Sequence, residues 1–170
     1  MNSRQTPDTV LLDFSNSVPQ TNWRAIDDEV MGGRSTSAPD IANGCLHFSG
    51  VLSLENNGGF ASIRAHHQQD LSKLHGVMLC ACGDGRRYQF RLYTDASYQG
   101  SRIAYSFGFD TVEGQWLEIP IPFSGLKPVF RGHNLPGPVF DAAKVEQIGF
   151  LLADKQVGSF HLAVAWIAEL

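Results

Sequence analysis

Three strand-like runs separated by two turn signals make up residues 56–95, which read NNGGFASIRAHHQQDLSKLHGVMLCACGDGRRYQFRLYTD. The Asn-Asn-Gly-Gly run at 56–59 and the Gly-Asp-Gly run at 83–85 are typical of tight turns between strands. In the third run, two sets of side chains alternate: Tyr88, Phe90 and Leu92 with Arg87, Gln89, Arg91 and Tyr93. Because successive side chains of a strand point to opposite faces, we expect the first set in a core and the second on an outer face.

The first run, residues 60–65, repeats this alternation with smaller apolar side chains. Its apolar members Ala61, Ile63 and Ala65 alternate with Phe60, Ser62 and Arg64. If the two strands belong to one sheet, the outer sets form one polar and aromatic patch: Phe60, Ser62, Arg64, Arg87, Gln89, Arg91 and Tyr93.

The rest of the chain also alternates with a period of two and has almost no helical periodicity. We expect further strands over residues 10–14, 45–54, 77–82, 102–109, 115–121, 147–153 and 158–169. Gly50 is expected to mark a β-bulge, and Pro120 and Pro122 indicate either the edge of a sheet or the end of a strand. Residues 36–44 are rich in turn residues, 128–140 form a long Pro/Gly-rich loop, and 141–145 form one helical turn. These roughly nine or ten strands predict an all-β fold, a β-sandwich or jelly roll.

Composition limits the class of protein. The 170 residues are 43% hydrophobic and 18% charged, which is typical of a globular chain with a sizeable core. We expect a disordered tail over residues 1–8 and a single domain over 9–170. No apolar run reaches the roughly 18 residues of a membrane span, and no signal-peptide pattern opens the chain. Three cysteines do not make a disulfide scaffold, so a reducing, cytoplasmic location is expected.

Positive charge is unevenly distributed, although the net charge of −4 argues against binding to a nucleic-acid backbone. The chain has nine arginines and four lysines, and five of the arginines lie between Arg64 and Arg102. Arginine suits planar, bidentate contact with carboxylate or phosphate. Two interpretations remain open: these arginines pair with carboxylates of the chain itself, or they contact a ligand or a partner.

An acidic segment followed by a glycine pair, Asp27-Asp28-Glu29-Val30-Met31-Gly32-Gly33, also has two interpretations. It is a surface loop whose acids meet solvent or the nearby arginines, or it is a loop that lies against a ligand or a partner. Glycines allow positive φ and close backbone approach, which suits either. The candidate partner- or ligand-binding residues are Asp27, Asp28, Met31, Gly32, Gly33, Asn57, Phe60, Arg64, Arg87, Gln89, Arg91, Tyr93 and, in the long loop, Arg131.

Catalytic and metal motifs are absent from the sequence. It contains no P-loop, no G-x-S-x-G and no H-E-x-x-H, and the Gly-Asp-Gly run lacks the third glycine of a dinucleotide motif. Cys80 and Cys82 share a strand face but have no second pair to complete a tetrahedral metal site. Asp27 and Asp28 are adjacent on a loop, which seldom keeps the fixed separation of a glycosidase carboxylate pair. We therefore expect no enzyme activity, no metal and no cofactor.

Several of these stretches together resemble the complex I intermediate-associated protein 30 family. They are Trp23 with residues 27–35, residues 57–62, residues 83–93, Trp116, Phe130-Arg131-Gly132, residues 147–150, and Gly158 with Phe160. The resemblance implies a galactose-binding-like β-sandwich similar to carbohydrate-binding modules. Mitochondrial members are assembly factors that hold an intermediate of respiratory complex I. No transit-peptide pattern opens the sequence, so we expect a short single-domain member like those of bacteria.

The resemblance and the arginine face predict a non-enzymatic binding module that holds a protein partner, with respiratory-complex subunits as the candidates. The alternative is a module that binds a glycan or small molecule through the same Arg/Tyr face. The shape of the face separates the two. A concave pocket that presents Tyr93 among convergent polar groups favours a ligand. A flat patch, or arginines paired with Asp27 and Asp28, favours a partner or a purely structural role.

Overall fold

The computed structural model describes residues 5–16, 22–28 and 32–170. Within these ranges the chain forms thirteen β-strands and three short 3₁₀ turns. The strands of the first half are β1 (Val10–Asp13), β2 (Trp23–Ala25), β3 (Thr36–Ala42), β4 (Cys45–Leu52), β5 (Ala61–Gln69), β6 (Gly76–Cys82) and β7 (Arg87–Tyr98). Those of the second half are β8 (Ser101–Asp110), β9 (Trp116–Pro122), β10 (Lys127–Phe130), β11 (His133–Asn134), β12 (Val145–Leu152) and β13 (Gly158–Glu169). The 3₁₀ turns are η2 (Glu55–Asn57), η3 (Phe123–Gly125) and η4 (Ala142–Lys144).

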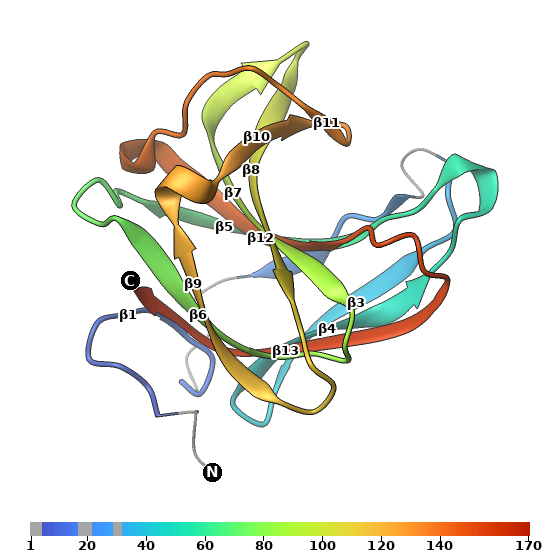
Figure 1. The fold of residues 1–170 in the computed structure, drawn as a ribbon, viewed down its shortest axis with the longest axis horizontal. Coiled ribbons are helices and arrows are strands. Elements are labelled where there is room, and N and C mark those ends of the chain that lie inside the picture. Colours follow the sequence, from blue (N-terminus) through green and yellow to red (C-terminus); the bar gives the residue numbers. More distant parts are fainter. Residues whose placement is uncertain (1–4, 17–21, 29–31) are drawn as a thin grey trace.

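The strands form two antiparallel sheets that pack face to face (Figure 1). One sheet has seven strands in the order β11-β10-β8-β7-β12-β5-β2. The other has six, in the order β3-β4-β13-β6-β9, with β1 paired to β13. The fold is therefore a β-sandwich, as the sequence predicts.

The main core lies between the sheets and is built from the apolar sets of the alternating strands. Phe48 of β4, Phe90 of β7 and Phe150 of β12 are among its fully buried rings. Tyr88 and Leu92, expected beside Phe90, are buried too, and so is the set Ala61, Ile63 and Ala65. The predicted division of these two strands into a core side and an outer side is confirmed.

Two expectations about individual segments are wrong. Residues 36–44 contain β3 instead of a run of turns, and the Pro/Gly-rich stretch 128–140 contains the β10–β11 hairpin. β3 lies at the edge of its sheet, where Pro39 is tolerated and few side chains are buried, so the strand has no apolar alternation to reveal it. The prolines at 120 and 122 are a reliable signal, because β9 does lie at the opposite edge.

In the described ranges, no helix has the length and apolar character needed to cross a membrane.

Gly50 does not form the predicted bulge. It pairs in regular register with Ser37 of β3, and a Cβ atom at this position would lie 1.9 Å from the carbonyl oxygen of Thr36. The glycine therefore permits an unusually close approach of the edge strand.

Gly50→Ala should accordingly lower the free energy of unfolding by about 1–3 kcal/mol, because an added methyl group has to push β3 away. Urea denaturation measures this difference. Val51→Ala, on the same strand but at a side chain that is 49% exposed, serves as the control and should cost less than about 1 kcal/mol. A Gly50→Ala protein as stable as the wild type would show that β3 moves without cost.

Candidate functional site

One row of residues crosses six strands on the outer face of the seven-stranded sheet. In register from β2 to β10 it consists of Arg24, Arg64, Gly149, Arg91, Ser106 and Lys127. Their neighbours along β5, β12 and β7 point into the core, so these side chains point away from it. We call this set the arginine row. It contains four cationic residues and no acid.

Arg64 is held by uncharged groups. Its guanidinium carbon lies 3.9 Å from the centroid of the Tyr93 ring, and Nη1 lies 3.5 Å from Oε1 of Gln147. Tyr93 is on the outer face, as predicted, but only 3% of it is exposed. A Cβ at Gly149 would lie 2.8 Å from the carbonyl oxygen of Ile63, so the glycine allows close approach of β5, and the Tyr93 ring lies at ordinary contact distance from that position. The Tyr93 ring therefore packs against the guanidinium of Arg64 and does not present an open aromatic face.

Arg91 is likewise oriented by a neutral amide. Its Nη2 donates to Oε1 of Gln89 at 3.0 Å, and the same oxygen accepts from the Ser106 hydroxyl at 2.8 Å. A carboxamide fixes the direction of a guanidinium without neutralising its charge. Arg64 and Arg91 are thus both partly buried and both ordered by groups that carry no charge.

The positive charge of these two residues is not compensated within the described part of the chain. No carboxylate of those residues lies within 4.0 Å of either guanidinium, and the Nε atoms of both are buried without a hydrogen-bond partner there. Other arginines do pair internally, Arg86 with Asp154, Arg87 with Asp110 and Arg102 with Glu146. Internal pairing therefore accounts for some of the clustered arginines but not for Arg64 and Arg91. Buried unpaired donors are costly and call for an explanation.

The acidic segment forms a separate cluster in which the carboxylates meet serines and backbone amides. Asp28 is fully buried and accepts four hydrogen bonds, from the amide of Ser35 at 2.8 Å, its hydroxyl at 2.7 Å, and the amides of Gly59 at 2.7 Å and Phe60 at 3.3 Å. Asp27 accepts three, from the amide and hydroxyl of Ser37 and the amide of Ser62. Neither carboxylate lies within 4.0 Å of a described arginine.

Two glycines, Gly33 of the acidic segment and Gly58 of the 56–59 turn, make room for the Asp28 carboxylate. A Cβ at Gly33 would lie 2.4 Å from its Cγ, and one at Gly58 would lie 2.4 Å from its Oδ2. Gly32 has a φ of +86°, in the region that favours glycine. Burial by itself would raise the pKa of Asp28, but the hydrogen bonds from Ser35, Gly59 and Phe60 outweigh it, and the net effect lowers the pKa.

The remaining candidate residues do not join the arginine row. Arg87 is exposed and lies 2.9 Å from Asp110. Arg131 lies in the β10–β11 turn, over the ring of Phe130. Phe60 is partly exposed, and its amide belongs to the Asp28 cluster. Met31 and the side chain of Asn57 lie outside the described residues.

Sequence reasoning missed five members of the site: Arg24, Ser106, Gln147, Gly149 and Lys127. Each is ordinary by itself, and each becomes informative only when the strand register places it beside Arg64 or Arg91. The sequence predicts a strand over residues 102–109, but nothing in it singles out Ser106. The strand order was not visible, so the row could not be assembled.

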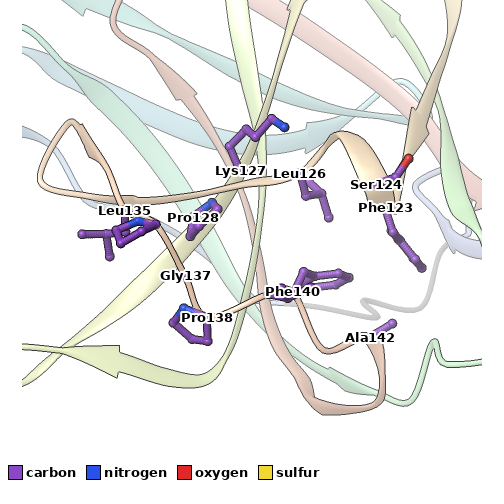
Figure 2. Close-up of a pocket in the computed structure, with 12 residues that line it drawn as sticks. Phe123, Ser124, Leu126, Lys127, Pro128, Leu135, Gly137, Pro138, Phe140 and Ala142 are labelled. Atoms are coloured by element: carbon purple, nitrogen blue, oxygen red, sulfur yellow. The ribbon is translucent and has the colours of Figure 1, made fainter.

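Two cavities lie away from Arg64 and Arg91, although Lys127 at the end of the row is among the residues that line the first. One, of about 500 Å³, is lined by apolar side chains near η3 and β10; Figure 2 shows Phe123, Leu126 and Phe140 around it, with the Lys127 side chain pointing away. The other, of about 430 Å³, lies on the six-stranded sheet beside His47 and His161. The two imidazole rings stack, and Nδ1 of His47 lies 2.8 Å from Nε2 of His161. The described residues contain no group of three His, Cys, Asp or Glu side chains that could hold a metal.

The two-sheet sandwich defines the class: a galactose-binding-like β-sandwich of the kind found in carbohydrate-binding modules. The family 11 carbohydrate-binding module of the cellulase Lic26A-Cel5E of Clostridium thermocellum superposes with a TM-score of 0.70 at 16% identity, covering 97% of this chain and 95% of that one. The same module in complex with a β-1,3-1,4-mixed-linked tetrasaccharide gives 0.68, also at 16% identity, covering 95% of this chain and 94% of that one. At this identity the likeness concerns the fold alone.

The sequence matches the complex I intermediate-associated protein 30 family over residues 12–164, and the chain belongs to that family. An uncharacterized protein of Schizosaccharomyces pombe is 26% identical over 166 residues, covering 85% of this chain and 76% of that protein. The mitochondrial complex I intermediate-associated protein 30 of Mus musculus is 26% identical over 181 residues, covering 93% of this chain. The chain spans only 55% of the mouse protein.

Proposed function

We propose that this protein is a non-catalytic binding module that holds a protein partner during the assembly of respiratory complex I. The arginine row is the surface that contacts the partner. The observation that carries the proposal is the pair Arg64 and Arg91, two ordered guanidiniums without a carboxylate partner in the described part of the chain. Arginines kept in this state cost stability, and a contact with another molecule explains why they are retained.

Membership of the family supports the assembly part of this proposal. The mouse relative is named for its association with a complex I intermediate, and this chain matches it over most of its own length. An assembly factor needs a recognition surface but no reaction centre. Asp27 and Asp28, two adjacent carboxylates, both have their oxygens engaged in hydrogen bonds to serines and amides.

The glycan-binding alternative draws its support from the likeness to carbohydrate-binding modules, one of them in complex with a tetrasaccharide. Sugar recognition of that kind generally uses open aromatic rings as stacking platforms. Here the Tyr93 ring is buried beneath Arg64, so the centre of the face offers guanidinium groups and not a ring. This arrangement favours a protein partner over a glycan, because arginine is among the residues that dominate protein contacts.

An affinity pull-down from the native host tests the proposal. The bait proteins are wild type, the Arg64→Met/Arg91→Met double variant and the Arg34→Gln variant. The last is the control, because it removes an arginine charge outside the arginine row. Arg34 is exposed and pairs with the exposed Glu55, outside the arginine row. We expect complex I subunits to be recovered by wild type and by the control but lost with the double variant. Recovery of no complex I subunit by wild type would overturn the proposed assembly role. Equal recovery by all three proteins would overturn the assignment of the contact to the arginine row.

A further inference from the structure

We infer that the arginine row recognises carboxylates, and that its occupant is an extended acidic segment of the protein partner. The inference rests on the proposed function and names the chemistry of the recognised group. Arg64 and Arg91 form the centre of the site, Gln89 and Gln147 are positioning residues, and Arg24 and Lys127 extend it to either side.

The donors that remain open determine which group fits. A guanidinium carries five N–H donors in a rigid fork. In the described residues, Nη1 of Arg64 donates to Gln147 and Nη2 of Arg91 donates to Gln89, while both Nε atoms are buried. The remaining Nη donors of the two arginines are therefore the ones left for a bound group. A planar carboxylate accepts two parallel N–H bonds from such a fork and supplies the missing negative charge.

The two guanidiniums are already oriented before anything binds. The Tyr93 ring lies under Arg64, with 3.9 Å between its centroid and the guanidinium carbon, and Gln147 accepts from Nη1 of the same arginine. Gln89, itself bonded to Ser106, holds Arg91. Pre-ordering of this kind lowers the entropic cost of binding, so it benefits an interaction made repeatedly with a partner.

The length of the row limits the occupant to a short extended segment. Neighbouring strands lie about 4.8 Å apart, so the five steps from Arg24 to Lys127 span about 24 Å. About seven residues of extended chain cover that distance. A net charge of −4 disfavours approach of a generally acidic surface or a nucleic acid, so recognition is confined to carboxylates that reach the row.

A labelled heptapeptide with alternating Glu and Gly residues, compared with one that carries Gln in place of Glu, tests this inference by fluorescence anisotropy. We expect wild type and Arg34→Gln to bind the Glu peptide at least about tenfold more tightly than the Gln peptide. Arg64→Met/Arg91→Met should lose that preference. Arg64→Lys/Arg91→Lys should retain only part of it, because lysine keeps the charge without the fork. Equal binding of the two peptides by wild type, or an unchanged preference in the Met variant, would overturn the inference.

Thermal melting separates recognition from a purely structural role. If the arginines exist for binding, the Arg64→Met/Arg91→Met protein should melt within about 3 °C of wild type or higher, because two uncompensated charges are removed. A midpoint lowered by about 10 °C or more would indicate that the two residues support the fold, and the inference would fail. Glu-peptide binding without recovery of complex I subunits would leave this inference standing and remove the assembly role. Recovery of complex I subunits that is unaffected by the Met substitutions would exclude the arginine row as the contact surface and overturn this inference, while the assembly role would remain.

Discussion

Alanine in place of Asp28 should lower the free energy of unfolding by about 3–5 kcal/mol, one of the largest losses expected for a single side chain here. The carboxylate is fully buried and accepts hydrogen bonds from Ser35, Gly59 and Phe60, two of which come from a turn about thirty residues away. Its removal leaves these buried donors unsatisfied and leaves a space between Gly33 and Gly58. Urea denaturation monitored by tryptophan fluorescence measures the loss.

Asp110→Ala is the matched control, because Asp110 also has a partner in the chain, Arg87, but its side chain is 80% exposed. It should cost less than about 1 kcal/mol. If Asp28→Ala cost as little as this control, the turn at 58–60 would not depend on the carboxylate.

The same site predicts how stability depends on pH. The pKa of Asp28 is lowered in the folded protein, while an unfolded aspartate titrates near about 3.9. The stabilisation is therefore fully present above about pH 4 and is lost as the pH falls through the lower folded pKa. Asp28→Asn removes this titration, so the difference in stability between wild type and Asp28→Asn should shrink on acidification below about pH 4. A difference that stays constant down to pH 2 would contradict this assignment.

The alternating strands were predictable from the sequence because burial acts on each residue locally. Phe90 and Leu92 lie in the core, and Gln89 and Arg91 lie outside it, because successive side chains of a strand point to opposite faces of the sheet. Proline at 120 and 122 likewise predicts an edge strand through its missing N–H alone. Such signals need no knowledge of the rest of the fold.

The relations between distant segments were not predictable in this way. The acids at 27 and 28 and the arginines at 64 and 91 appear in the sequence as possible partners, yet the carboxylates meet serines and amides. Arg64 and Arg91 come together because β12, from the far end of the chain, pairs between their strands and contributes Gly149. Strand order and register arise from packing of the whole molecule, so a single sequence does not reveal which unpaired charges become neighbours.

Asp154→Ala should also lower the free energy of unfolding by about 3–5 kcal/mol, because it strands a buried arginine. Asp154 and Arg86 form a bidentate ion pair at 2.7 and 2.8 Å, and only 6% and 10% of their side chains are exposed. Arg86 also donates to the carbonyl oxygens of Gly158 and Ser159. It therefore fastens the β12–β13 connection to the turn that opens β7.

A double-mutant cycle distinguishes the value of this pair from the cost of breaking it. We expect Arg86→Met/Asp154→Leu to be less destabilised than the sum of the two single substitutions, because no charge is then left buried alone. The exposed pair Arg87 and Asp110 provides the matched cycle one residue along the strand, and its coupling should stay below about 1 kcal/mol. Equal coupling energies in the two cycles would mean that burial adds nothing to the Arg86–Asp154 interaction. A coupling energy found only for the buried pair would show that a partly or fully buried arginine of this chain stabilises the fold when a carboxylate pairs with it. Arg64 and Arg91 have no such carboxylate among the described residues, and binding to a partner explains why they are retained.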